Sequence, residues 1–183
     1  LEYGKPIYLP VDEKHPVSPI SNYGKQKNII TNYCIRLAKT RGLKSVILRT
    51  SNPYGPHLHE TKSEYNIINK FIDQFIRNKE IYLFGDGSQV RDYLYIEDLI
   101  DLLVLLTKKN IAQGMIFNIG GGKGYAIKET AREIIKQLHK GRIKYKKWDK
   151  QTLAVESGNY ISDISLIYKT TGWVPKTSLK QGI

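Results

Sequence analysis

The feature of this sequence that most constrains its fold is an alternation of short β-rich runs with longer segments of helical periodicity. Apolar residues recur at helical spacing from Ile29 to Leu37, and Gly42 follows where a helix can end in the left-handed conformation. The β-rich run Ser45–Arg49 comes next and leads into a loop at residues 52–56. A run of this composition, bounded by a turn, is typical of a buried strand.

The same alternation continues along the rest of the chain. Amphipathic helices are predicted over residues 22–41, 67–76, 97–109 and 127–138 and a short helix over 165–170, with β-rich runs over 81–84, 93–96, 115–119 and 142–146. Prolines in the first twenty residues forbid a continuous helix there. Strands and helices that alternate in this way indicate an α/β fold. A length of 183 residues suits one domain with a sizeable core, or one domain and part of another.

The chain carries a large excess of positive charge. Lys plus Arg number 29 and Asp plus Glu number 17, so the formal net charge is +12. Such an excess favours polyanionic partners, which include nucleic acid, anionic membrane surfaces and phosphorylated small molecules. The basic residues are scattered, apart from a denser stretch over 140–150, and no recognisable nucleic-acid module accompanies them. We therefore expect no nucleic-acid partner, and a basic nucleic-acid binder remains an alternative class.

Cysteine usage and hydropathy bear on the compartment. Cys34 is the single cysteine, which rules out an intramolecular disulfide and fits a reducing compartment such as the cytoplasm. We expect Cys34 to lie in the core. The longest apolar runs, such as residues 99–106, are too short to span a bilayer, so no integral membrane segment is expected. No leader sequence opens the chain, and Leu1 is expected to be a cut in a longer protein.

Two polar side chains at the start of the first predicted helix form a candidate acid/base pair. Tyr23 and Lys27 are four residues apart and therefore share one helix face. A phenol with an unperturbed pKa of about 10 is a poor base at neutral pH, but a nearby ammonium favours the phenolate. The pair could supply a general base, although the same spacing also arises by chance in structural helices.

Other polar residues receive plainer interpretations. His57 and His59 could place two imidazoles on one side of an extended segment, but no third ligand is apparent, so no metal site is expected. Arg142, Lys144 and Lys146 alternate along a strand and are interpreted as a solvated face. Attraction of that face to an anionic membrane is a weaker alternative.

Three stretches, in order, resemble the signatures of the extended short-chain dehydrogenase/reductase family. Residues 18–27 (Ser-Pro-Ile-Ser-Asn-Tyr-Gly-Lys-Gln-Lys) contain the Tyr-x-x-x-Lys pair, residues 48–56 read Leu-Arg-Thr-Ser-Asn-Pro-Tyr-Gly-Pro, and residues 84–93 read Phe-Gly-Asp-Gly-Ser-Gln-Val-Arg-Asp-Tyr. Near the end of the chain, residues 163–165 and 172–175 are similar to the family's closing Asp-x-Ser and Gly-Trp-x-Pro elements. The resemblance runs from about Tyr3 to Ile183.

The resemblance implies a fold and a domain organisation. The fold expected is the C-terminal part of a Rossmann-type doubly wound parallel sheet plus a small α/β substrate-binding domain. Residues 1–56 would form the back part of the NAD-binding domain. Residues 57–183 would form mainly the substrate-binding domain, with 93–119 partly returning to the Rossmann sheet. A homodimer is also implied, with the Tyr23 helix in its helical bundle.

The resemblance also implies roles for individual residues. Tyr23 would be the acid/base at a sugar hydroxyl, Lys27 would hold the nicotinamide ribose, and Ser51 would lie beside the nicotinamide of NAD. The remaining roles concern a nucleotide-sugar substrate: Asn52 and Arg91 at its diphosphate, and the backbone of the strand from Tyr82 to Phe84 at its base. For Arg91, a guanidinium fork suits phosphate oxygens on general grounds. The structural alternative is a surface ion pair of Arg91 with Asp92 or Asp86.

The implied activity is that of a nucleotide-sugar epimerase. The reaction expected is C4 epimerisation of a UDP-hexose or UDP-N-acetylhexosamine through a transient 4-keto sugar, with bound NAD accepting and returning hydride. A 4,6-dehydratase or reductase of the same family, or an inactive substrate-binding fragment, remain alternatives. Dehydratases carry an Asp-Glu pair before the Tyr-Gly that matches Tyr3-Gly4. In the simplest register their glutamate falls at Leu1, which disfavours the dehydratase.

Two departures from the family pattern bear on the site. No glycine-rich turn for the pyrophosphate of NAD and no catalytic Ser or Thr precede Tyr3, and the glycines at 120–122 lack the Gly-x-Gly-x-x-Gly spacing. Many relatives also place an arginine for the distal phosphate before Asp163. Here residues 156–160 read Glu-Ser-Gly-Asn-Tyr, after lysines at 146, 147 and 150. A lysine at that phosphate would lack the bidentate geometry of arginine.

Overall fold

The computed structural model describes residues 2–56, 67–77, 79–108 and 114–183. The longer helices are α1 (Asn22–Arg41), α2 (Ile67–Ile76), α3 (Ile96–Lys108) and α4 (Ile127–Leu138), and the short ones are α5 (Lys150–Val155), α6 (Ser165–Thr171) and α7 (Leu179–Gly182). The strands are β1 (Ile47–Thr50), β2 (Asn52–Tyr54), β3 (Glu80–Phe84), β4 (Val90–Tyr95), β5 (Ile116–Ile119), β6 (Gly124–Ala126) and β7 (Arg142–Lys146). Within the described ranges, no helix is long and apolar enough to cross a membrane.

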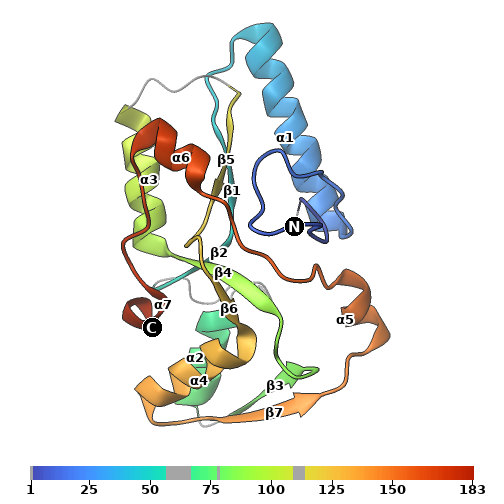
Figure 1. The fold of residues 1–183 in the computed structure, drawn as a ribbon, viewed down its shortest axis with the longest axis vertical. Helices are drawn as coiled ribbons and strands as arrows, with labels where there is room; N and C mark the ends of the chain where they lie inside the picture. Colours follow the sequence, from blue (N-terminus) through green and yellow to red (C-terminus); the bar gives the residue numbers. More distant parts are fainter. Residues whose placement is uncertain (1, 57–66, 78, 109–113) are drawn as a thin grey trace.

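The strands pair mainly in parallel, across long stretches of intervening sequence. β1 pairs with β5, so that Ile47 lies opposite Ile116, and β3 pairs with β7. β4 lies between β2, to which it is parallel, and β6, to which it is antiparallel. In Figure 1 the β1–β5 pair lies between α1 on one side and α3 and α6 on the other. The predicted α/β fold is confirmed.

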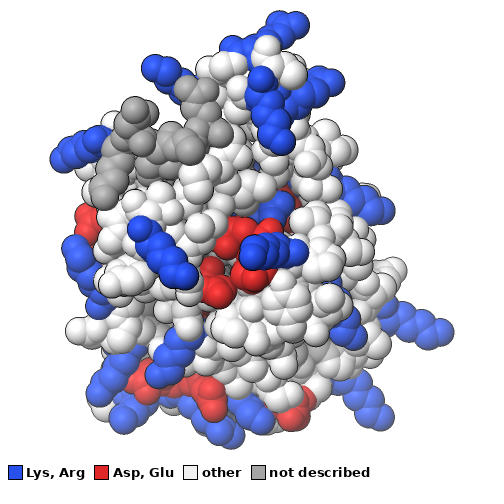
Figure 2. Space-filling model, turned by 45° about the horizontal axis from the view of Figure 1, so that its top comes forward, with Lys and Arg blue, Asp and Glu red and all other residues white. Residues whose placement is uncertain are grey.

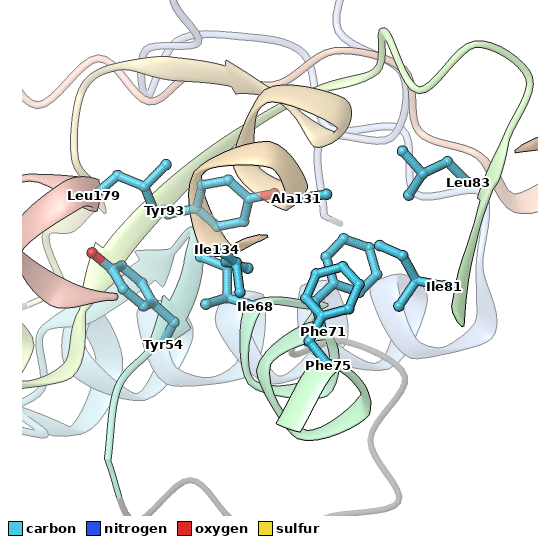
Figure 3. Packing of buried hydrophobic residues seen from close by; sticks show 10 residues of the cluster. All are labelled: Tyr54, Ile68, Phe71, Phe75, Ile81, Leu83, Tyr93, Ala131, Ile134 and Leu179. Carbon is cyan, nitrogen blue, oxygen red and sulfur yellow. The ribbon is translucent and has the colours of Figure 1, made fainter. Parts of the chain in front are cut away.

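Buried apolar side chains form two clusters. The first joins α2, β3 and α4 and is built around Phe71, Phe75, Ile81 and Ile134 (Figure 3). The second lies between the β1–β5 pair and the helices α3 and α6, and Phe117 is completely buried within it. The amphipathic pattern of α2 and α4 explains the first cluster, because their apolar stripes face each other. The division into two domains remains a prediction, and its boundary after residue 56 adjoins the undescribed segment 57–66.

Helix α1 begins and ends with recognisable caps. The Ser21 hydroxyl accepts a hydrogen bond from the Gly24 backbone N–H at 3.1 Å, and Gly42 adopts the left-handed conformation with a φ of 65°. The predicted helix is therefore confirmed. Cys34 is only half-buried, so the expectation that it lies in the core is not met.

The apolar side chains of α1 are largely exposed in the described part of the chain. Ile29, Ile30 and Tyr33 are 68%, 55% and 52% exposed, whereas the buried positions of the helix include Thr31 and Ala38. Small side chains of α1 thus face the protein, whereas Ile29, Ile30 and Tyr33 face outward. The outward face of α1 therefore carries exposed apolar side chains beside charged ones such as Lys25 and Arg36, and these apolar side chains have no cover among the described residues.

The C-terminal segment is attached to α3 through one buried carboxylate. Asp98 accepts hydrogen bonds from the backbone N–H groups of Lys176 at 3.1 Å and Thr177 at 2.9 Å. The indole Nε1 of Trp173 donates to the Asp98 carbonyl at 3.2 Å, and the Trp173 ring packs in the second cluster. These contacts explain why a Gly-Trp-x-Pro element at this place fixes the end of the chain to the sheet.

Candidate active site

Tyr23 and Lys27 lie together in the first turns of α1. The Nζ of Lys27 is 5.4 Å from the centroid of the Tyr23 ring, and the Tyr23 side chain is 43% exposed. The helical spacing predicted this contact, and the exposure leaves the ring open to a ligand. A cation at this distance interacts favourably with the ring.

Ser51 lies at the junction of β1 and β2. Its backbone N–H donates to the Ile119 carbonyl at 2.8 Å, which continues the β1–β5 ladder. Its side chain is buried, and its Oγ has no hydrogen-bond partner among the described residues. A buried hydroxyl without a partner is costly, and a bound ligand that offers a polar atom would remove that cost.

Asn52, the first residue of β2, has a structural contact. Its Nδ2 donates to the Asp92 carbonyl at 2.8 Å and thereby links β2 to β4. The Asn52 side chain is half-buried. The amide group is therefore held in a fixed orientation at the C-terminal end of β1.

Tyr82 and Phe84 lie on one face of β3, opposite the buried Ile81 and Leu83. Tyr82 is about half exposed, at 51%. The Phe84 ring stacks on Trp148 with 4.8 Å between centroids and 17° between planes. Sequence reasoning missed the contact with Trp148, because this residue lies far along the chain from Phe84.

Lysines accompany these aromatic rings. Lys146 places its Nζ 3.9 Å from the Phe84 ring centroid, and Lys144 pairs with Glu80 at 2.8 Å. The lysines of β7 were interpreted as a solvated face, and Lys144 is indeed 54% exposed at its side chain. Lys146 is thus engaged with an aromatic ring.

Arg91 is held by a carboxylate that the sequence did not suggest. Its Nη2 lies 2.7 Å and 2.9 Å from the two carboxylate oxygens of Glu156. Its Nη1 donates to the carbonyls of Gly158 at 2.8 Å and Val90 at 3.1 Å. The side chains of Arg91 and Glu156 are only 17% and 18% exposed. The interpretation of Arg91 as a partner of Asp92 or Asp86 is therefore wrong.

Asp92 itself is completely buried and has a different role. Its carboxylate accepts from the backbone N–H groups of Gly121 at 2.8 Å and Ser162 at 3.0 Å. Burial raises its pKa to about 6. A Cβ on Gly120 would clash with this carboxylate, and one on Gly121 would clash with the Tyr93 carbonyl. These glycines therefore permit close packing against Asp92 and Tyr93.

A second polar network joins the N-terminal segment to α1 and the β1–β5 pair. The Glu2 carboxylate accepts from Thr31 of α1 and from Arg49 of β1. Arg49 also donates to the Tyr3 hydroxyl at 2.9 Å, and that hydroxyl donates to Asn118 of β5 at 2.7 Å. Sequence reasoning missed this network, because its members are brought together only by the fold.

The surface charge distribution also shows acidic side chains beside basic ones. In Figure 2, acidic and basic side chains meet in a hollow of the face shown, while many other basic side chains stand out singly. No group of three or more His, Cys, Asp or Glu residues suited to a metal ion occurs in the described ranges. His57 and His59 lie outside them.

Comparison with known proteins identifies the family. Residues 1–120 match the model of the NAD dependent epimerase/dehydratase family. The chain belongs to this family, which agrees with the resemblance to extended short-chain dehydrogenases/reductases. Its members named below are nucleotide-sugar epimerases and dehydratases.

Individual relatives cover almost the whole chain. A putative UDP-glucose 4-epimerase of Methanocaldococcus jannaschii is 37% identical over 99% of this chain and 57% of its own length. A dTDP-glucose 4,6-dehydratase of Haemophilus influenzae is 29% identical over 93% of this chain and 52% of its own. The crystal structure of UDP-glucose 4-epimerase from Thermotoga maritima with UDP-glucose is 31% identical, has a TM-score of 0.86, and is matched over 98% of this chain and 57% of its own. The chain thus spans about half the length of these relatives.

Proposed function

We propose that the protein is an NAD-dependent nucleotide-sugar epimerase that inverts C4 of a UDP-hexose or UDP-N-acetylhexosamine. The observation that carries the proposal is the Tyr23–Lys27 pair at the exposed start of α1, in a chain of the NAD dependent epimerase/dehydratase family. The relatives from M. jannaschii and T. maritima, both described as UDP-glucose 4-epimerases, support this choice of reaction.

In the proposed reaction, Tyr23 moves a proton to and from the sugar. It accepts the proton of the 4-hydroxyl while C4 is oxidised to the ketone, and it returns the proton when the ketone is reduced on its other face. The ammonium group of Lys27 lies 5.4 Å from the centroid of the Tyr23 ring and places a positive charge beside the site of proton transfer. The ring is exposed enough to reach a substrate hydroxyl.

The residues of this chain fit the nicotinamide-ribose end of NAD. Ser51 offers a buried hydroxyl that lacks a partner among the described residues, and Lys27 offers an ammonium for the ribose hydroxyls. NAD, when bound, supplies the hydride acceptor and donor. We propose Tyr23, Lys27 and Ser51 as the contacts of this chain with the cofactor.

The substrate contacts proposed here are Asn52, Arg91 and the strand from Tyr82 to Phe84. Asn52 and Arg91 are amide and guanidinium groups suited to the oxygens of a diphosphate. Tyr82 is exposed on β3, and this strand lies at the edge of its two-stranded sheet, a position that suits pairing of its backbone with a planar base. Each role rests on the family resemblance together with this placement.

A second candidate is a 4,6-dehydratase or reductase of the same family. The relative from H. influenzae, described as a dTDP-glucose 4,6-dehydratase, supports it at 29% identity. The two reactions share the oxidation at C4 and differ in the fate of the 4-keto sugar. A protein without turnover that still binds nucleotide sugars is the third possibility.

The experiment that tests the proposal is a product assay on the intact protein. UDP-glucose, UDP-galactose and their N-acetyl forms are incubated with the protein and NAD, and the products are separated and weighed by mass spectrometry. Interconversion of C4 epimers at unchanged mass supports the epimerase. A product lighter by one water identifies the dehydratase. Binding of a nucleotide sugar without formation of any product indicates a substrate-binding protein without turnover.

A further inference from the structure

The Arg91 guanidinium already grips an anion that belongs to the chain itself. Two oxygens of Glu156 lie 2.7 Å and 2.9 Å from the Arg91 Nη2, and both side chains are largely shielded from water. A carboxylate held by an arginine in this way presents two anionic oxygens, as the edge of a phosphate does. The candidate diphosphate position of Arg91 is therefore filled by Glu156.

The segment that brings Glu156 to Arg91 is loosely held on one side. Glu156 follows directly after α5, which buries none of its residues and exposes Leu153 and Val155 by more than half. In Figure 1, α5 stands at the margin of the molecule, away from the other helices. Little packing free energy thus opposes a movement of α5.

The other side of the same segment is firmly attached. The Asn159 Oδ1 accepts from the Val90 N–H at 2.9 Å, and the Tyr160 N–H donates to the Val90 carbonyl at 3.1 Å. Gly158 lies between the two sides with a φ of 74°, a conformation that favours glycine. A rotation at Gly158 can therefore carry Glu156 and α5 away while residues 159 and 160 stay on β4.

A cavity and the side chain of Lys5 lie beside Gly158. The cavity measures about 500 Å³ and is lined by residues 5–9 together with Gly158 and Asn159. A Cβ on Gly158 would lie 3.5 Å from the Cγ of Lys5. The volume suits a small-molecule ligand, and Lys5 adds positive charge beside the Arg91 loop.

We propose that Glu156 is an internal competitor for the anion site at Arg91, and that a diphosphate group binds there by displacing Glu156 and releasing α5. The ligand class, a nucleoside diphosphate sugar, rests on the proposed function. A diphosphate carries more than one negative charge and can engage Arg91 and Lys5 together, whereas Glu156 offers one charge. A ligand with a single negative charge therefore displaces Glu156 less readily than a diphosphate does.

The test compares the intact protein with its Glu156→Gln variant. Glutamine keeps the shape of the side chain and an oxygen for the Gly158 N–H, but it lacks the charge that holds Arg91. Calorimetry with UDP and with inorganic pyrophosphate should show binding about tenfold tighter in the variant, which corresponds to about 1.4 kcal/mol. Binding of uridine, which has no phosphate, should be unchanged.

Asp73→Asn is the matched control. Asp73 of α2 forms an exposed pair with Arg77, which directly follows the helix, so this variant removes the same charge without touching Arg91. Its affinity for both ligands should equal that of the wild type. An equal gain in Asp73→Asn would ascribe the effect to net charge and overturn the proposal.

Hydrogen exchange on the wild type tests the displacement without any substitution. UDP should accelerate exchange in α5 and at the Gly158 N–H, because that N–H loses its Glu156 acceptor at 2.9 Å. Slower exchange in these amides with UDP bound, or unchanged affinity in Glu156→Gln, contradicts the displacement and leaves the epimerase proposal standing. If neither variant nor wild type binds UDP or pyrophosphate, Arg91 is no exchangeable anion site and the displacement is wrong. The turnover assay decides the epimerase separately.

Discussion

Tyr23 is the single residue on which the proposed chemistry depends. Replacing Tyr23 with Phe keeps the ring beside Lys27 but removes the hydroxyl that carries the proton. General acid/base groups typically contribute about 10²- to 10⁴-fold in rate. We therefore expect kcat for C4 epimerisation to fall by about 10³-fold in Tyr23→Phe, with KM nearly unchanged, in steady-state assays of the intact protein.

Tyr33→Phe is the control for that experiment. Tyr33 is another exposed tyrosine of α1, 52% accessible, and its ring contacts Arg36 rather than Lys27. This variant should retain wild-type turnover. A Tyr23→Phe variant with undiminished kcat would remove Tyr23 from the chemistry.

Asp92 predicts a pH dependence of stability with a definite sign. Burial raises its pKa from 3.8 to about 6, so the folded protein keeps the proton that the unfolded chain loses between these values. The contribution of Asp92 to the free energy of unfolding should therefore fall by about 2 kcal/mol as the pH rises from 4 to 6, and by a few tenths of a kcal/mol more up to pH 7. Urea unfolding of the wild type and Asp92→Asn at pH 4, 5, 6 and 7 measures this as a difference between the two proteins. A pH-independent difference would contradict the shifted pKa.

The contacts of the site residues could be predicted from the sequence only where both partners are close together in the chain. The Tyr23–Lys27 contact follows from helical spacing alone. The contact between Arg91 and Glu156 could not be predicted in this way, because Glu156 lies 65 residues further along the chain and only the fold brings the two together. The same holds for Trp148 against Phe84. The sequence does show Glu156 in the stretch where many relatives carry an arginine, but it does not show that the Glu156 carboxylate binds Arg91.

At the scale of elements, Asp98 should be decisive for the C-terminal segment. Alanine at this position leaves two backbone N–H groups without an acceptor, those of Lys176 and Thr177. Each such group costs about 1–3 kcal/mol. We expect Asp98→Ala to lower the free energy of unfolding by about 2–6 kcal/mol in urea titrations.

The neighbouring Asp101 provides the comparison. Its carboxylate forms an exposed pair with the Lys176 ammonium at 3.3 Å, with side chains 60% and 74% accessible. Exposed pairs of this kind contribute at most about 1 kcal/mol. Equal losses in Asp101→Ala and Asp98→Ala would show that the buried contacts carry no special weight.

Elements with a detectable apolar period or β-rich run were predictable, including the short helix α6, and the shortest elements were not. Helices α1 to α4 and strands β3, β5 and β7 have apolar periods or β-rich runs long enough to detect. The helices α5 and α7 span six and four residues, and β2 and β6 span three each, too few for a period. Tertiary pairing, such as that of β2 with β4, creates these short elements.

For the whole molecule, the outward face of α1 supports the homodimer implied by the family resemblance. Ile29 and Ile30 stand exposed on one helix, and an apolar helix face of this kind is suited to association. We expect the intact protein to sediment as a dimer and Ile30→Glu to sediment as a monomer, because a buried charge at the interface is costly. Ile76→Glu, an equally exposed position on α2, should remain dimeric. A monomeric wild type would refute the prediction.

The fold class was predictable for the whole chain, whereas the arrangement of the core was not. Alternating strands and helices indicated an α/β fold, but the pairing of β1 with β5 joins segments that only tertiary structure brings together. The chain spans about half the length of the relatives named above, which are matched over 52% and 57% of theirs.

The hydrogen bonds of Glu2 hold α1 at a point two turns along the helix from the proposed catalytic tyrosine. Glu2 joins Thr31 of α1 to Arg49 of β1, and Thr31 is about 12 Å along the helix axis from Tyr23. A small rotation of α1 about Thr31 therefore produces a larger displacement of the start of the helix. A tilt of about 5° moves the Tyr23 ring by about 1 Å, and a misplacement of that size can cost about 10²-fold in rate. A substitution of Glu2, which touches no substrate, can therefore slow the reaction by turning a helix.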